Sequence, residues 1–267
     1  MLTEEQKRRY TEDGYLVFED VLTEAELVAL RAASDALQDE RRRVGGEERL
    51  AVIQDVVYKG DAFMQTARHP FLLAVVTDLI GPDLQIQHCK LNWKPPTISK
   101  GEIDWHQDFP FFPHTNYDLL AVMFLLEDAT PENGCMRVVP GSHKLGPLPH
   151  NQDGTFVGKL TDRLAVEGRE PVDLIVKAGG LTIHHCLTVH SFYPNTTDTP
   201  RRGLVYQIRA ADAVQLGGNF WRSNGLQLRG EDPWVARCVE GRVKLSHHLV
   251  NRGGIPCEEV RISNIAE

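Results

Sequence analysis

The chain has 267 residues, of which 42% are hydrophobic and 25% are charged, proportions that are ordinary for a globular protein. Its formal net charge of −8 argues against a nucleic-acid partner, because such partners favour a basic protein face. No apolar run approaches the ~18 residues of a membrane span, and the polar start of the chain does not resemble a signal peptide. The five cysteines include no CxxC pair, so we expect reduced thiols in a cytoplasmic protein without a membrane partner.

Residues 1–82 are predicted to be mainly helical. Thr3 and Gln6 have the spacing of a capping box, in which each side chain bonds the backbone of the other residue. Leucines after Thr23 repeat at helical spacing, and Gly81-Pro82 is a stop signal for a third helix. The predicted helices run from Thr3 to Asp13, from Thr23 through Leu37, and from Phe63 to Leu79.

Short apolar runs between glycine and proline turns dominate the rest of the chain, which is typical of strands. The predicted strands cover residues 15–18, 84–87 with 90–93, 119–126, 136–139, 174–176, 181–183 and 203–208. Ala178-Gly179-Gly180 predicts a hairpin turn between two of them. The polar segment 147–169 would be a long loop, and long connections near a site are often lids.

Several short strands with glycine and proline turns indicate a β-sandwich or a jelly roll. We therefore expect one domain over residues 1–267 that is mainly β with α. The helices of residues 1–82 would pack outside the barrel.

The tripeptide His106-Gln107-Asp108 and the distant His190 carry the strongest chemical signal. Side chains two residues apart on a strand point the same way, so His106 and Asp108 can reach one ion from a single strand. Two imidazoles and one carboxylate can occupy one face of an octahedral Fe(II), which leaves three positions for a cosubstrate and oxygen. Arg201 and Arg202 follow His190, and a guanidinium matches the carboxylate of a keto acid. Neighbouring residues on an extended segment point to opposite faces, so only one arginine can serve.

Four segments around these residues resemble the phytanoyl-CoA dioxygenase family of Fe(II)/2-oxoglutarate oxygenases, which includes ectoine hydroxylase. The segments are Tyr10–Val17, Trp105–Asp108, Asn133–His143 and Val189–Asn195, followed by Arg201. The resemblance implies a double-stranded β-helix, which is the jelly roll of the cupin-like enzymes. It also implies that His106, Asp108 and His190 ligate Fe(II), that Arg201 binds the 5-carboxylate of 2-oxoglutarate, and that O2 is the oxidant.

The resemblance further implies a role for Asn92, whose position in the family also contacts 2-oxoglutarate. Where the family often has a serine two residues after the distal histidine, this chain has Phe192. Arg201 is therefore expected to obtain help from Asn92 or Thr188. Family halogenases replace the carboxylate ligand with a small residue, so Asp108 places this chain nearer the hydroxylating branch.

Other residues are weaker candidates for contact with a substrate. Lys90 lies two residues before Asn92, where an amine would attract a substrate carboxylate or phosphate, although a lysine at the barrel rim fits the sequence equally well. Phe109, Phe111 and Trp221 are candidates for the substrate wall, with core packing as the alternative. His184 is expected to be a core residue or to support the ligands, since an unbroken strand would carry it ~3.3 Å per residue away from His190.

The expected activity is hydroxylation of an unactivated C–H bond in a small metabolite or natural-product intermediate, with release of succinate and CO2. Desaturation, epimerisation and cyclisation use the same oxidant and stay open. A non-catalytic 2-oxoglutarate-binding protein and a cupin-like enzyme with another metal are the rival interpretations. The complete triad followed by Arg201 argues against both rivals. The identity of the substrate and the oligomeric state are not indicated by the sequence.

Overall fold

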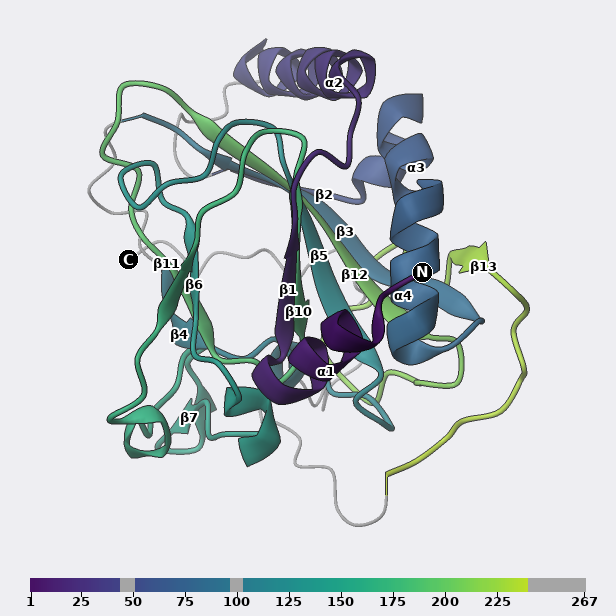
Figure 1. The fold of residues 1–267 in the computed structure, drawn as a ribbon, viewed down its shortest axis with the longest axis vertical. Coiled ribbons are helices and arrows are strands. Elements are labelled where there is room, and N and C mark those ends of the chain that lie inside the picture. Colours follow the sequence, from purple (N-terminus) through teal and green to yellow (C-terminus); the bar gives the residue numbers. More distant parts are fainter. Residues whose placement is uncertain (44–50, 97–102, 240–267) are drawn as a thin grey trace.

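The computed structural model describes residues 1–43, 51–96 and 103–239 (Figure 1). Its α-helices are α1 (Glu4–Asp13), α2 (Glu24–Arg43), α3 (Asp61–Ala67) and α4 (Pro70–Ile80). Short 3-10 turns lie at Val56–Tyr58, Phe109–Phe111, Ser142–Leu145 and Leu164–Val166. No helix in these ranges combines the length and the apolar character that a bilayer crossing requires.

The strands form two principal antiparallel sheets, which are joined through a shared apolar core. The larger sheet has the order β1-β10-β5-β12-β3-β13, with β2 also paired to β3, and the smaller sheet has the order β4-β11-β6-β9. The strands of the larger sheet are β1 (Tyr15–Phe18), β2 (Ala51–Gln54), β3 (Leu84–Lys94), β5 (Leu119–Leu125), β10 (Leu181–His185), β12 (Arg201–Ala210) and β13 (Gln227–Arg229). Those of the smaller sheet are β4 (Ile103–His106), β6 (Met136–Val138), β9 (Val172–Leu174) and β11 (His190–Phe192), and β7 (Asn151–Gln152) pairs separately with β8 (Thr155–Phe156). The predicted jelly roll, mainly β with α, is confirmed.

The larger sheet has two faces of different character. On β12, Leu204, Tyr206 and Ile208 point outward into a core shared with α2, α3 and α4, which gather on that side in Figure 1. Val205 points inward and packs with residues of the smaller sheet such as Met136. This alternation follows from the two-residue period of a strand, and full burial of each large apolar side chain contributes about 1.5–3 kcal/mol.

The first helix begins and ends where the sequence predicts. Thr3 and Gln6 make both bonds of the capping box, and Gly14 ends the helix with φ of 80°. Glycine adopts this left-handed conformation without steric cost. A side chain at Gly14 would also collide with the ring of His143 and the hydroxyl of Thr188. The close approach brings the end of α1 against Thr188, two residues before His190.

The helix predicted from Phe63 to Leu79 is wrong in its continuity, because the structure has two helices there. The first ends at Ala67, and Pro70 is the first residue of the second. Proline disfavours the helical conformation in the residue before it, and His69 has φ −57° and ψ 129°. The apolar pattern from Phe63 to Leu79 therefore contains two helices, and Pro70 sets the boundary between them.

The hairpin predicted around Gly179-Gly180 is also wrong. The strand before the turn, β9, pairs with β6 in the smaller sheet, whereas β10 pairs with β5 and β1 in the larger sheet. The turn therefore carries the chain from one sheet to the other. A side chain at Gly180 would lie 2.7 Å from the backbone oxygen of Phe18, so glycine is required by this close approach.

Tyr206 offers a test of how α3 is attached to the sheet. Its buried hydroxyl donates a hydrogen bond of 2.6 Å to the carbonyl of Phe63. We expect Tyr206→Phe to lower the free energy of unfolding by about 1–2 kcal/mol, because the carbonyl loses its buried donor. Urea denaturation measures the change. As the control, Tyr58→Phe alters a side chain that is 41% exposed and should change stability by less than about 0.5 kcal/mol. Equal effects of the two substitutions would contradict this role of Tyr206.

Candidate metal centre

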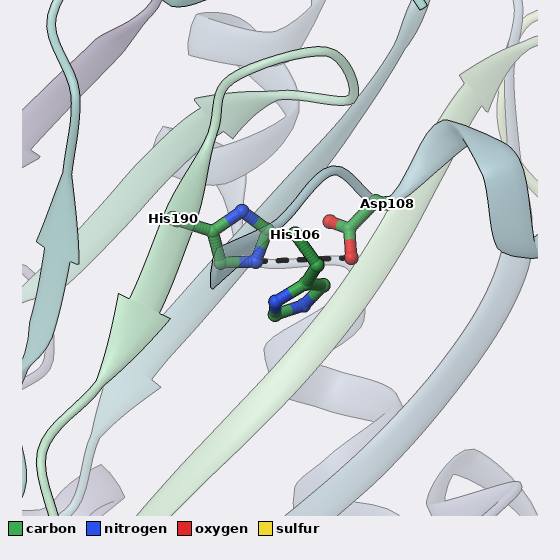
Figure 2. Close-up of side chains that lie close together, drawn as sticks. All are labelled: His106, Asp108 and His190. Atoms are coloured by element: carbon green, nitrogen blue, oxygen red, sulfur yellow. Dashed lines mark ion pairs between the residues drawn. The ribbon is translucent and has the colours of Figure 1, made fainter. Parts of the chain in front are cut away.

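His106, Asp108 and His190 converge as predicted, and their ligand atoms all lie within 4.8 Å of one another. The register of two strands explains the convergence. His106 is the last residue of β4 and His190 is the first residue of β11, and the two are directly opposite in the antiparallel pair. Figure 2 shows the three side chains directed toward one another, with Asp108 Oδ1 3.8 Å from His190 Nε2. Within the part of the chain that the structure describes, no other group of this kind is found.

The carboxylate reaches the centre by a different route from the predicted one. Strand β4 ends at His106, and Asp108 has helical backbone angles of φ −71° and ψ −39° at the start of the turn Phe109–Phe111. The expectation that Asp108 shares a strand face with His106 is therefore wrong. The turn, which contains Pro110, and not the pleat of a strand, directs the carboxylate of Asp108 toward His190.

Both imidazoles are oriented by backbone carbonyls. Nδ1 of His106 lies 2.8 Å from the carbonyl oxygen of Asp104, and Nδ1 of His190 lies 2.9 Å from that of Thr188. Since a carbonyl only accepts, each Nδ1 donates its proton and each Nε2 is left with a lone pair for a metal. Burial lowers the pKa of both imidazoles, which keeps them in the neutral form that ligates metals.

The second oxygen of Asp108 is held by two residues of the larger sheet. Oδ2 accepts hydrogen bonds from Nε2 of His184 at 3.0 Å and from Nε2 of Gln207 at 2.7 Å. Burial alone would raise the pKa of Asp108, but the neighbouring His190, His184 and His106 hold that pKa well below its usual value. The carboxylate is therefore ionised, and Oδ1 is the oxygen left for a metal.

The donor set fits Fe(II). Two neutral imidazoles and one carboxylate oxygen suit this ion, and three protein ligands leave positions open for a bidentate cosubstrate and oxygen. The three side chains are nearly or fully removed from solvent. Buried polar atoms without a hydrogen-bond partner also occur among the residues around the centre, namely Nδ1 of His184, Oε1 of Gln207, Oδ1 of Asn92 and Nε of Arg201. Such atoms are costly when left unpaired, which favours a polar ligand in this region.

Arg201 and Arg202 point to opposite sides of β12, as predicted. Arg202 pairs on the helix side with Glu127 and, at 2.7 Å, with Asp35. Arg201 is only 1% exposed and makes no ion pair with a described residue. Its Nη2 donates to the carbonyl of Gly134, and burial lowers its pKa to about 10. A buried guanidinium without a carboxylate is a site for a carboxylate ligand.

The residues around Arg201 contact one face of its guanidinium and leave room beside Nη1. Its guanidinium lies over the ring of Phe192, 5.6 Å from the centroid, so the phenylalanine supplies a cation–π contact where the family often has a serine. Gly203, two residues along β12, has no side chain, and a Cβ there would lie 3.1 Å from Nη1 of Arg201. Asn92 is directly opposite Gly203 on β3, on the same face.

The hydroxyl of Thr188, which was expected to help Arg201 bind 2-oxoglutarate, is bonded to another part of the chain in this structure. Its hydroxyl donates to the carbonyl of Gly14 at 2.8 Å. Its own carbonyl accepts from His190. The hydroxyl and the carbonyl of Thr188 are therefore both used in these contacts, and the carbonyl orients His190, a candidate metal ligand.

The candidates for the substrate wall are placed differently from one another. Phe111 lies beside the centre, with its ring centroid 5.7 Å from that of His106. Phe109 is 1% exposed and packs in an apolar cluster with Tyr117, so it faces the core. Trp221 lies 6.0 Å from the ring of His88, which is on β3.

The predicted long loop contains local structure and packs beside β4 and the turn that follows it. Phe156 of β8 packs its ring 4.9 Å from that of Phe111, and the amide of Leu160 donates to the carbonyl of Trp105. A hollow of about 540 Å³ lies between this loop and Trp105, but none of the metal-centre residues lines it.

Two supporting residues were less visible in the sequence. His184 was expected in the core or as a support, and its bond to Asp108 places it as a support. Gln207 was missed, although it lies in the predicted strand 203–208 at an even spacing from Arg201, which was a usable signal.

A known protein family matches most of the chain. Residues 10–203 match the model of the family described as phytanoyl-CoA dioxygenase (PhyH). The chain is 30% identical over 258 residues to a probable alpha-ketoglutarate-dependent hypophosphite dioxygenase of Stutzerimonas stutzeri, and the match covers 88% of this chain and 89% of that protein.

Two solved structures are similar as well. One is SnoK, a non-heme alpha ketoglutarate dependent carbocyclase from nogalamycin biosynthesis, with a TM-score of 0.70, 28% identity, and coverage of 86% of this chain and 95% of that chain. The other is the epimerase SnoN in complex with Fe3+, alpha ketoglutarate and nogalamycin RO, with a TM-score of 0.68, 26% identity, and coverage of 86% and 96%. The chain therefore belongs to the phytanoyl-CoA dioxygenase family of Fe(II)/2-oxoglutarate-dependent dioxygenases.

Proposed function

We propose that this dioxygenase hydroxylates an unactivated C–H bond of a small metabolite or natural-product intermediate and releases succinate and CO2. One observation carries the proposal: three buried side chains that could hold a metal ion, and a buried arginine without an ion pair to a described residue, occupy the inside of the same jelly roll. A binding protein without catalysis would need the arginine but has no need of the complete triad. The retained carboxylate of Asp108 favours hydroxylation over halogenation.

In this proposal each residue has a definite task. His106, Asp108 and His190 hold Fe(II), which together with 2-oxoglutarate and O2 supplies the oxidising chemistry. Arg201 binds the far carboxylate of 2-oxoglutarate, and Asn92 contributes a polar contact from the facing strand. Phe111 and the segment around Phe156 exclude water on the side of β4.

Epimerisation or cyclisation is a second candidate, and a specific observation favours it. SnoN and SnoK are named as an epimerase and a carbocyclase, and both have the same fold as this chain. The hypophosphite dioxygenase of Stutzerimonas stutzeri is named for an inorganic anion. These relatives all act on small molecules, so we propose a small-molecule substrate here. We place the enzyme in the cytoplasm, where its free thiols stay reduced.

The role of Asp108 can be tested by removing its carboxylate. Anaerobic Fe(II) with 2-oxoglutarate is expected to give a weak visible charge-transfer band in the wild type, and Asp108→Ala should abolish it because one of three ligands is lost. Asp198→Ala removes an exposed carboxylate with no role at the centre and should leave the band unchanged. Succinate release, screened across candidate substrates with Asp108→Ala as the blank, identifies turnover. A band of wild-type intensity in Asp108→Ala would refute the assignment.

The adjacent arginines give a matched pair for the cosubstrate. Arg201→Lys keeps the charge but loses the planar fork, and we expect it to weaken 2-oxoglutarate binding roughly 10–100-fold. Arg202→Lys changes the neighbouring residue on the opposite face and should leave 2-oxoglutarate affinity unaltered. Titration of 2-oxoglutarate against the charge-transfer band measures both affinities. The assignment fails if the two variants bind 2-oxoglutarate equally well.

The support that His184 gives to Asp108 can be separated from general packing. His184→Phe removes the hydrogen bond to Oδ2, and loss of such a bond to a ligand is expected to lower Fe(II) affinity about 10–100-fold. His185→Phe makes the same change one residue later, where the ring lies beside Tyr10 and His143, away from the ligands. Anaerobic calorimetry with Fe(II) compares the two. Equal losses in both variants would point to packing and not to Asp108.

A further inference from the structure

Lys90 lies on the inner face of the larger sheet, near the metal centre. It is directly opposite Val205 of β12, and residues opposed in this way project from the same face. Val205 packs in the cluster between the two sheets, and Gln207, two residues further, bonds Asp108. Lys90 therefore shares its face with Asn92 and with the residues that hold Asp108.

The ammonium of Lys90 has no anion of its own. It makes no hydrogen bond or ion pair with any residue in the described ranges. Burial lowers its pKa, and the one carboxylate that opposes this effect is Asp108. That carboxylate is already used, because Oδ2 accepts from His184 and Gln207 and Oδ1 belongs to the metal centre. Lys90 is partly buried, and a charged amine withdrawn from water in this way is stabilised by an anionic partner.

The charges of a centre that holds Fe(II) and 2-oxoglutarate can be balanced without Lys90. Fe(II) and Arg201 together carry three positive charges, and Asp108 with the dianion of 2-oxoglutarate carries three negative charges, so these groups cancel. The histidine ligands are neutral. Lys90 adds a positive charge to this balanced set from the inner face of the sheet, which also carries Lys94.

We propose that the substrate is a small anion, carrying a carboxylate or a phosphorus oxyanion, and that Lys90 binds this group beside the metal. The inference rests on the proposed function, since it concerns the substrate of the same site. The surroundings agree with a polar ligand. Gln54 is opposite Lys90 on β2, and the amides of Gln54 and Asn92, each of which has donor as well as acceptor atoms, leave Oε1 and Oδ1 buried without a partner. Two residues from Lys90, His88 packs against Phe112 and Trp221, which border this region with aromatic rings.

The test uses the full-length protein loaded anaerobically with Fe(II) and 2-oxoglutarate. Calorimetry measures binding of sodium hypophosphite, sodium propionate and, as the neutral counterpart of propionate, propionamide. We expect the wild type to bind at least one of the two anions and to bind propionamide more weakly. Which anion binds more tightly distinguishes the phosphorus oxyanion from the carboxylate.

Three substitutions complete the experiment. Lys90→Met should weaken anion binding roughly tenfold or more, because a charge-assisted hydrogen bond is lost, while Lys90→Arg keeps the charge and the preference over propionamide. Lys59→Met makes the same change at an exposed lysine and should have no effect. The charge-transfer band with 2-oxoglutarate should be intact in all three, which shows that each variant is folded and loaded.

Several results would overturn the proposal. They are equal binding of anions and propionamide by the wild type, unchanged anion affinity in Lys90→Met, and loss of 2-oxoglutarate affinity in Lys90→Met, which would assign the lysine to the cosubstrate. Failure of the proposed function would be recognised by a different result, because the wild type itself would then show no charge-transfer band.

Discussion

The pairing of β4 with β11 is the constraint on which the site depends. Its register sets His106 opposite His190, and Cα atoms of directly opposed residues in such a pair lie only ~4.5–5.5 Å apart. Each imidazole is then turned by a carbonyl two residues earlier in its own chain segment. The backbone alone therefore fixes the position and the orientation of two of the three proposed metal ligands. The third ligand comes from the turn that ends β4, so all three depend on the same strand pair.

The larger sheet supplies the residues that bond Asp108. The polar residues of the site lie on one face of this sheet, and the residues of the main apolar core lie on the other. Along β12, Arg201 and Gln207 face inward, whereas Tyr206 and Arg202 face the helices. The helix side holds the apolar core and the paired charges, which stabilise the fold without any ligand. The inner side collects polar groups that lack partners, a pattern that costs stability and is typical of a binding site. Helices α2, α3 and α4 thus pack on the face of the larger sheet opposite the one that carries Arg201 and Gln207.

The sequence allowed the triad and the fold class to be predicted because each signal is local, follows a fixed period or belongs to the family resemblance. His106 and Asp108 lie two residues apart, the distant His190 was identified from the family resemblance, and the alternation of Arg201 and Arg202 requires only an extended segment. What failed depended on contacts that no local pattern contains. The turn at Gly179 joins two sheets, and the hydroxyl of Thr188 is taken by Gly14, a residue far away in the sequence. The single domain over residues 1–267 stays a prediction, and residues 240–267 lie outside the described residues.

The carbonyl of Gly14 has a consequence for how the chain tolerates shortening. It accepts a hydrogen bond from the hydroxyl of Thr188 at 2.8 Å and another from the amide of His185 at 2.9 Å. A truncation that removed the residues before β1 would leave both donors without their acceptor. One of these donors is Thr188, the residue whose carbonyl orients His190. The beginning of the polypeptide contributes no ligand, yet it belongs to the scaffold that keeps one imidazole in place.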